Sequence, residues 1–401
     1  MPEDQELTTD IEFPPAIPVP FEPSPVFGDL RDEQPVARVR LPTGDHAWLV
    51  TRHADNRDLL ASPWLSRAAA AKPGAPRIRR IPLDTESMTT MDPPEHTRLR
   101  KLVLRAFTSQ RVAAMSPRIE KRAAGLIDDL VATGPPADLV GGFAEPLSLG
   151  VIAELLGVPA TDFERFRTWS LTYLATTGRD PAAVAEAERQ LKGYFTELIA
   201  ARRSDPADDL LSDLVRARSE ERLTEGELVT LAVTLLIAGY ETTASLIAGA
   251  VVALFRHPDQ LEILRSRPEM LPSAVEELLR YTPIAVSGGT IRVATRDIEL
   301  GGTAVREGEA VLPSTTSANR DGAVFDEPDR LDITRDHNPH LAFGHGPHRC
   351  LGSQLARAEL SVSLRTLLAH FPGLRLAVPL EDVPWRLGGM IRRPEELPIT
   401  W

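Results

Sequence analysis

Cys350 is the only cysteine of the chain, and it lies in the glycine-punctuated segment 343–352, directly before a helical pattern. A thiolate at this place can bind a metal ion, because free backbone N–H groups of the first helical turn can point at the sulfur. Gly344 and Gly346 can adopt positive φ angles and let the backbone approach a flat cofactor closely. Phe343 can pack beside the sulfur and keep water away, which tunes a bound metal. The segment therefore predicts a metal–thiolate site.

Two other interpretations of this segment stay open on residue types alone. A free cysteine is often buried as a small apolar side chain. A zinc site could use His345, His348 and Cys350, but only one residue separates His348 from Cys350. Paired zinc ligands are usually separated by about two to four residues. A zinc site also gives no role to Phe343 and the glycines.

A second constellation, Ala238–Thr243, lies in the middle of a long apolar segment. Its glycine, Gly239, costs about 1 kcal/mol relative to alanine within a helix. Thr242 can donate to the Ala238 carbonyl and bend the helix. We expect a small groove for dioxygen, with the Glu241 acid and the Thr242 alcohol beside it. The pattern also fits an ordinary core helix in which the polar side chains have hydrogen-bond partners within the protein.

Charged residues at helical spacing form a third group. Glu277 and Arg280 are three positions apart, and His96 and Arg100 are four apart, so each pair shares a helix face. Most such pairs are solvated surface pairs.

The segment 343–352 resembles the haem-binding loop of the cytochrome P-450 haem-thiolate monooxygenases. The shared motif is Phe-Gly-x-Gly-x-His-x-Cys-x-Gly, filled here by Phe343, Gly344, Gly346, His348, Cys350 and Gly352. The resemblance covers nearly the whole chain and is closest to soluble bacterial members of the actinobacterial type. It implies that Cys350 is the axial ligand of the iron of haem b, with Phe343 and Gly344 beside the cofactor. A cysteine ligand pushes electron density onto the iron and favours O–O cleavage.

The same resemblance assigns roles to the other constellations. It implies that Ala238 and Gly239 face the cofactor and that Thr242 and Glu241 guide protons during oxygen activation. The implied partners of the two haem propionates are the four cations His96, Arg100, Arg292 and His348.

Glu277 and Arg280 match the family's Glu-x-x-Arg pair, a structural lock beneath the haem. The third member of that lock should be a later arginine, and the candidates are Arg320, Arg330 and Arg335.

A substrate pocket is implied by position, and its side chains are mostly apolar. Each of them alone also fits ordinary core packing. Together they predict a bulky, largely apolar substrate. The pocket residues are Met88, Leu236, Ile237, Ile284, Val286, Ser287, Met390 and Ile391.

The function that follows is a haem-thiolate monooxygenase of secondary metabolism, such as antibiotic biosynthesis. It would insert one oxygen atom from O2 into a small molecule, with electrons from a ferredoxin and its reductase. An acidic ferredoxin could dock on a basic patch made of Lys101, Arg105, Arg349 and Arg357. One alternative is a haem-thiolate enzyme for oxidative coupling, desaturation or rearrangement. Another is a non-catalytic haem-binding sensor, against which the expected dioxygen groove speaks.

The elements that position these residues are mostly helical. Helical periodicity runs from residue 96 to about 255, and a capping box at 224–227 opens the longest helix. Strand patterns occur at 36–41, at 47–51 and within 290–312. We predict a mainly α protein with a small β-rich part, the cytochrome P-450 fold, as one domain over 26–401 after an extended, proline-rich lead over 1–25.

Composition narrows the class of protein further. The net charge of −12 over 401 residues argues against general binding to nucleic acid or anionic membranes. One cysteine excludes an intrachain disulfide and suits a reducing compartment. The segment 228–255 is apolar enough for a membrane span, but Glu241 at its middle makes that costly. We expect a cytoplasmic protein without a membrane segment.

Overall fold

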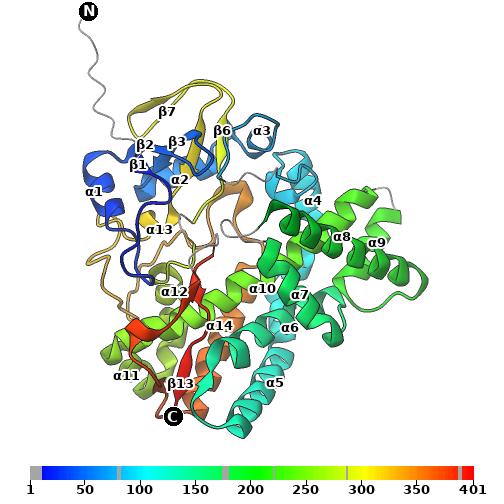
Figure 1. Ribbon diagram of the computed structural model, residues 1–401, viewed down its shortest axis with the longest axis vertical. Coiled ribbons are helices and arrows are strands. Elements are labelled where there is room, and N and C mark those ends of the chain that lie inside the picture. The colour runs from blue at the N-terminus through cyan, green and yellow to red at the C-terminus, as the bar shows by residue number, and fades with distance from the viewer. Residues whose placement is uncertain (1–10, 79–82, 174–179, 220–221, 286–287, 387–390) are drawn as a thin grey trace, which may run out of the picture.

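The computed structural model describes residues 11–78, 83–173, 180–219, 222–285, 288–386 and 391–401. Helices fill the larger part of the molecule, and a sheet with its connections forms the smaller part, away from the C-terminus (Figure 1). The α-helices in these ranges are α1 (Val26–Glu33), α2 (His53–Ala61), α3 (Arg67–Ala70), α4 (Glu95–Leu104), α5 (Ser109–Thr133), α6 (Glu145–Leu156), α7 (Phe163–Tyr173), α8 (Pro181–Ser204), α9 (Leu210–Ser219), α10 (Glu225–Arg256), α11 (Pro258–Ser266), α12 (Leu271–Tyr281), α13 (Thr315–Ala318) and α14 (Ser353–His370).

Short strands make up the β-rich part and a region near the C-terminus. The larger sheet has the order β1-β2-β3-β9-β6-β4, and smaller sheets join β10-β13-β5, β11-β12 and β7-β8. The strands are β1 (Ile11–Glu12), β2 (Val36–Arg40), β3 (His46–Val50), β4 (Leu65–Ser66), β5 (Ala137–Asp138), β6 (Arg292–Ala294), β7 (Ile298–Leu300), β8 (Thr303–Val305), β9 (Ala310–Pro313), β10 (Arg375–Leu376), β11 (Trp385–Arg386), β12 (Arg393–Pro394) and β13 (Pro398–Thr400).

Helix α10 runs through the centre of the helical part (Figure 1) and packs against α6, α8 and α14. Its start is the predicted capping box: Thr224 Oγ1 accepts from the Glu227 N–H at 3.1 Å, and the Glu227 carboxylate accepts from the Thr224 N–H at 2.8 Å. Among the helices described, only α10 is long and apolar enough to cross a membrane, yet 83% of its most apolar window is buried inside the protein.

Two strand pairings bring distant segments together. In the antiparallel pair β4–β6, Ser66 lies opposite Val293, so the register leads on to Arg67 beside Arg292. In the antiparallel pair β11–β12, Arg386 lies directly opposite Arg393. Each pairing therefore places two arginines next to each other.

The predicted fold class is confirmed, and the differences are local. The strands predicted at 36–41 and 47–51 are β2 and β3, which pair antiparallel. Helical structure also occurs before residue 96, where no helical pattern was predicted, because α3 and the start of α4 lie there. The described part of the predicted lead lies against the domain: β1 pairs with β2, and Phe13 is buried in the sheet's core.

Candidate active site

The cysteine loop, residues 343–352, forms a tight turn in front of α14. Gly344 and Gly346 have φ angles of +68° and +70°, a region that residues with side chains rarely adopt. A Cβ on Gly346 would lie 2.5 Å from the Leu60 carbonyl oxygen of α2. The predicted need for glycine is confirmed at both positions, and at Gly346 its physical reason includes the close approach of α2.

Opposing effects act on the pKa of the Cys350 thiol. Cys350 has exposed surface, yet protein atoms crowd it enough that burial raises the pKa of its thiol. The Gly352 N–H and the guanidiniums of Arg100, Arg349 and Arg357 lower that pKa without offsetting the effect of burial. A metal ion bound to the sulfur would favour the thiolate, because coordination deprotonates a thiol.

The zinc interpretation finds no ligand set. Within the described ranges, no group of three or more His, Cys, Asp or Glu side chains is arranged to hold a metal ion. The His348 ring stacks instead against His96 of α4, with the ring centroids 4.0 Å apart. A metal that arrives within its own organic cofactor and takes Cys350 as its protein ligand fits this arrangement.

Basic side chains that are buried or partly buried gather beside the cysteine loop. Arg292 is 2% exposed and donates through Nη1 to the carbonyls of Leu59 and Leu60 at 3.1 and 3.2 Å. Arg100 donates to the Arg349 carbonyl at 2.7 Å. The charges of four neighbouring side chains lower the pKa of His348. We call these residues together the cationic cluster: Arg67, His96, Arg100, Arg292 and His348.

The cationic cluster has too little negative charge. Burial, followed by the neighbouring cations, lowers the pKa of His96 to about 4 and that of His348 to about 2. Burial also lowers the pKa of Arg292 to about 10, and Asp92 is the one carboxylate that opposes this shift. His96 Nδ1 and the Nε and Nη2 atoms of Arg292 are buried without a hydrogen-bond partner in the described chain. These donors fit a cofactor with carboxylates, such as the two propionates of haem.

Sequence reasoning predicted four members of the cluster but missed Arg67. The spacing of His96 and Arg100 on one helix is a local signal, whereas Arg67 follows a two-residue strand and precedes a run of alanines. Only the β4–β6 pairing brings Arg67 to Arg292. Arg67 could have been found only if the pairing of β4 with β6 had been predicted from the strand patterns.

The middle of α10 shows the predicted bend-forming contact. Thr242 Oγ1 donates to the Ala238 carbonyl at 2.6 Å. A Cβ on Gly239 would lie 2.7 Å from Ile152 of α6. The glycine thus lets α6 and α10 pack closely, a reason that the sequence did not reveal, and a dioxygen groove at Gly239 remains a prediction.

Glu241 is buried and held by two arginines. Its Oε1 accepts from Arg386 Nη1 at 2.8 Å and from Arg393 Nε at 3.2 Å. Arg393 also donates to Glu145 of α6, and Arg167 Nε of α7 donates to the same carboxylate at 2.6 Å. The expected proton carrier therefore also anchors the strand pair β11–β12, a role that sequence reasoning missed.

The predicted lock is present, and its third member is Arg335. Arg280 makes a bidentate pair with Glu277 at 2.7 and 2.8 Å, and both side chains are fully buried. Arg335 Nε donates to Glu277 at 3.2 Å. Arg320 instead donates to the Tyr281 carbonyl, and Arg330 pairs with Glu327.

Of the predicted pocket residues, Val286, Ser287 and Met390 lie outside the described residues. Ile284 and Ile391 are brought together, because the Arg392 N–H donates to the Ile284 carbonyl at 2.7 Å and Ala285 bridges with Ile391. The turn that carries Met88 approaches α10 through Ser87 Oγ and Thr234 Oγ1, 3.4 Å apart. Leu236 and Ile237 are buried on α10. A single pocket lined by all of them remains a prediction.

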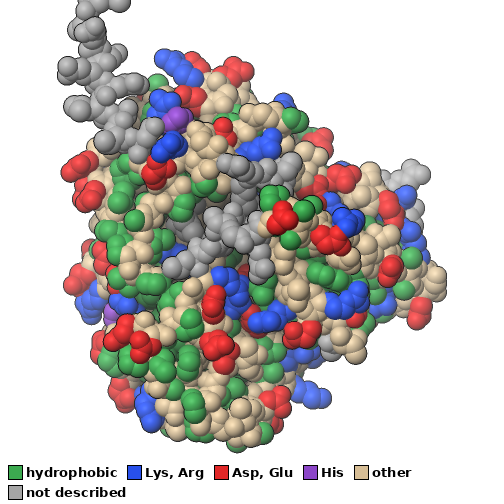
Figure 2. Space-filling model, in the orientation of Figure 1, with side chains coloured by type: hydrophobic (Ala, Val, Ile, Leu, Met, Phe, Trp, Pro, Cys, Tyr) green, Lys and Arg blue, Asp and Glu red, His purple; other side chains and the backbone are tan. Residues whose placement is uncertain are grey.

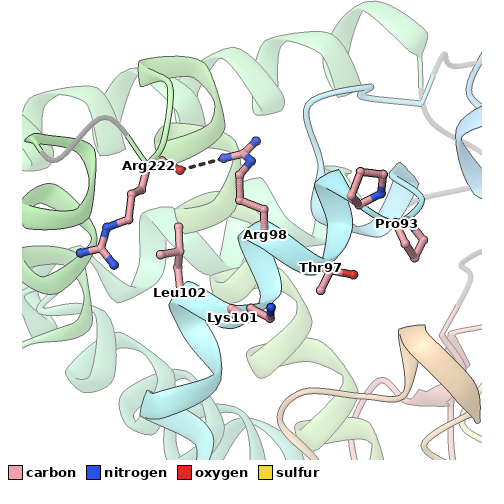
Figure 3. A pocket seen from close by; sticks show the side chains of 7 residues that line it. Pro93, Thr97, Arg98, Lys101, Leu102 and Arg222 are labelled. Atoms are coloured by element: carbon pink, nitrogen blue, oxygen red, sulfur yellow. Dashed lines mark hydrogen bonds between the residues drawn. The ribbon is translucent and has the colours of Figure 1, made fainter.

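Three of the four predicted docking cations are exposed: Lys101, Arg105 and Arg349. The fourth, Arg357, is a poor docking residue, because it donates to both carboxylate oxygens of Glu276 at 2.6 and 2.7 Å and lies 4.6 Å from the Phe343 ring. An open surface pocket of about 870 Å³ lies beside Lys101 (Figure 3). It is lined by Pro93, Pro94, Thr97, Arg98, Lys101, Leu102 and Arg222, and includes neither Cys350 nor Thr242.

Comparisons with known proteins identify one family. Residues 163–384 match the family model described as cytochrome P-450. The chain is 50% identical over 390 residues to nocardicin C N-oxygenase of Nocardia uniformis subsp. tsuyamanensis, covering 97% of this chain and 98% of that protein. It is 46% identical to mycinamicin IV hydroxylase/epoxidase of Micromonospora griseorubida, covering 94% of each. The crystal structure of HinD with NMFT and NO is similar, with a TM-score of 0.95 and 49% identity, covering 98% of this chain and 100% of that one.

Proposed function

This chain belongs to the cytochrome P-450 family and is a haem-thiolate monooxygenase, and we propose that it inserts one oxygen atom from O2 into a bulky, largely apolar secondary metabolite. The observation that carries the proposal is the single cysteine in front of α14 beside a cluster whose buried donors, His96 Nδ1 and Arg292 Nε and Nη2, have no hydrogen-bond partner in the described chain. Haem b would fit both features, because Cys350 would bind its iron and the cluster would hold its two carboxylates.

When bound, the haem iron supplies oxygen activation, and the protein supplies binding, orientation and protons. Cys350 would bind the iron, and the cationic cluster would hold the carboxylates. Thr242 Oγ1 directs its proton at the Ala238 carbonyl, which leaves its lone pairs to accept a hydrogen bond from an incoming donor. Glu241 Oε2 is buried without a partner in the described chain, so this oxygen is the atom available to accept or release a proton beside Thr242.

The apolar character of the described pocket residues supports the proposed substrate class. The test is a spectral titration of the purified enzyme with polyketide, terpenoid and peptide-derived compounds, followed by product analysis with labelled O2. We expect at least one bulky candidate to bind, with one labelled oxygen atom in its product. Binding restricted to small, highly charged acids would contradict the proposal.

We further propose a cytoplasmic enzyme that receives electrons from a ferredoxin and its reductase. Lys101, Arg105 and Arg349 support this, because an exposed basic surface attracts an acidic partner even on an acidic protein. Arg105→Glu combined with Arg349→Glu should slow reduction by ferredoxin at low salt while the CO-bound spectrum stays unchanged. An unaltered reduction rate would contradict ferredoxin docking at this surface.

A further inference from the structure

Arg67 is placed at the cationic cluster by its backbone. Its N–H donates to Asp92 Oδ1 at 2.9 Å, and Asp92 Oδ2 accepts from the Ser66 hydroxyl. Both oxygens of Asp92 are thus engaged by main chain and hydroxyl donors around β4. The Asp92 carboxylate fixes where the Arg67 side chain begins, and the Arg67 guanidinium extends beyond it.

The guanidinium of Arg67 donates to one backbone carbonyl and has one buried nitrogen without a hydrogen-bond partner in the described chain. Its Nη1 donates to the Thr89 carbonyl at 2.9 Å, whereas its Nε is buried without a hydrogen-bond partner in the described chain. Burial and then the charge of Arg292 lower the pKa of Arg67 to about 9, and Asp92 opposes both effects. A buried donor that stays unsatisfied on a cation beside other cations is costly unless an anion joins it.

Arg67 also lies beside another member of the cluster. Ser66 pairs with Val293 in the antiparallel β4–β6 register, which brings Arg67 next to Arg292. Arg292 has two buried donor atoms, Nε and Nη2, without a hydrogen-bond partner in the described chain. Arg67 is therefore close to a residue that we assign to the propionates.

We propose that Arg67 is a further haem-binding residue, which donates to a propionate and, through Thr89, fixes the turn Ser87–Met91 relative to the cofactor. That turn carries the buried Met88, and Ser87 Oγ approaches Thr234 Oγ1 of α10. One guanidinium, with its several donors in a fixed plane, can bridge a carboxylate and a carbonyl at once. The inference rests on the proposed function, because it requires that haem binds here. Arg67 would then connect the haem propionate to the turn Ser87–Met91, which carries the predicted pocket residue Met88.

The test compares three variants of the haem-loaded protein. Arg67→Ala removes both contacts, and Arg67→Lys keeps the charge but not the planar fork. The matched control is Arg296→Ala, because Arg296 is an exposed arginine beyond β6 whose guanidinium lies 3.8 Å from the Trp64 ring. Two quantities are measured: the rate of haem transfer to apomyoglobin, and hydrogen exchange of the backbone over 84–91.

For Arg67→Ala we expect haem transfer to be roughly 10- to 100-fold faster than in the wild type, from the loss of one charge-assisted hydrogen bond, and faster exchange over 84–91. Arg67→Lys should retain much of the haem but show the faster exchange, and Arg296→Ala should match the wild type in both. Haem transfer from Arg67→Ala at the wild-type rate overturns the haem contact, and unchanged exchange overturns the bridge. If the wild type itself shows no thiolate-ligated haem, the failure lies in the proposed function and not in Arg67.

Discussion

Glu241 stands between Arg386 and Arg393, and this pairing sets what its removal costs. Glu241→Gln leaves two largely buried arginines without their shared anion, and breaking such a pair typically costs about 3–5 kcal/mol. We expect a loss of this order in the free energy of unfolding of the haem-loaded protein, measured by denaturant titration. Asp297→Asn breaks the exposed pair with Arg306 and should change stability little. Equal stability of the two variants would contradict the anchoring role of Glu241.

Thr242 offers a cleaner test of proton handling, because its side chain makes no ion pair. Thr242→Val keeps the shape but removes the hydroxyl that could relay a proton. We expect product formation to fall by roughly 100-fold, in the range of general acid–base effects, while substrate affinity stays within about twofold of the wild type. The measurement is the amount of product formed relative to the amount of reduced electron donor consumed. An unchanged yield of product per electron pair would remove Thr242 from the proton path.

Glu276 gives a prediction for the dependence of stability on pH. Burial raises the pKa of Glu276, but hydrogen bonds from Arg357 and His340 outweigh this and lower the pKa to about 2, from an ordinary value of 4.5. Because the folded-state pKa is depressed, the carboxylate stabilises the protein above pH 4.5, and this stabilisation is lost as the pH falls toward 2. The difference in unfolding free energy between pH 6 and pH 4 should be smaller in Glu276→Gln than in the wild type. A difference of the same size in both would contradict the pairing.

At the scale of elements, the contact between the cysteine loop and α2 can be isolated with two matched glycines. Gly344 and Gly346 have nearly the same positive φ, but a Cβ meets nothing within 4 Å at Gly344 and meets the Leu60 carbonyl at 2.5 Å at Gly346. Gly344→Ala therefore adds backbone strain alone, and Gly346→Ala adds a backbone clash. We expect Gly346→Ala to retain clearly less haem, measured as haem per protein after purification. Equal retention would mean that α2 does not support the loop.

Local sequence patterns predicted the elements and part of the site. The cysteine loop, the capping box of α10 and the Glu277–Arg280 pair depend on residues within a few positions of one another. Arg67 and the arginines of the β11–β12 pair could not be predicted in this way, and Arg335 could not be chosen from its three candidates. They reach the site through strand pairings and loops that connect distant segments, and an isolated arginine in a sequence carries no sign of its partner. The close approach of α6 at Gly239 was missed for the same reason, because the contacting side chain lies on another helix.

At the scale of the whole molecule, the cationic cluster is a local concentration of positive charge in an acidic protein. Acidic and basic side chains intermingle over the face seen in Figure 2, with no large area of one sign. The net charge of the chain is −12. The buried, unpartnered donors of His96 and Arg292 favour a bound anion such as the haem carboxylates over a partner on the surface.

The central claim is that Cys350 is the thiolate ligand of haem iron, and one absorption spectrum tests it most directly. The reduced, CO-treated wild type should show the Soret band typical of thiolate ligation, and Cys350→Ala should lose that band. A colourless wild-type preparation, or a Cys350→Ala variant that keeps the thiolate band and the turnover, would contradict the account.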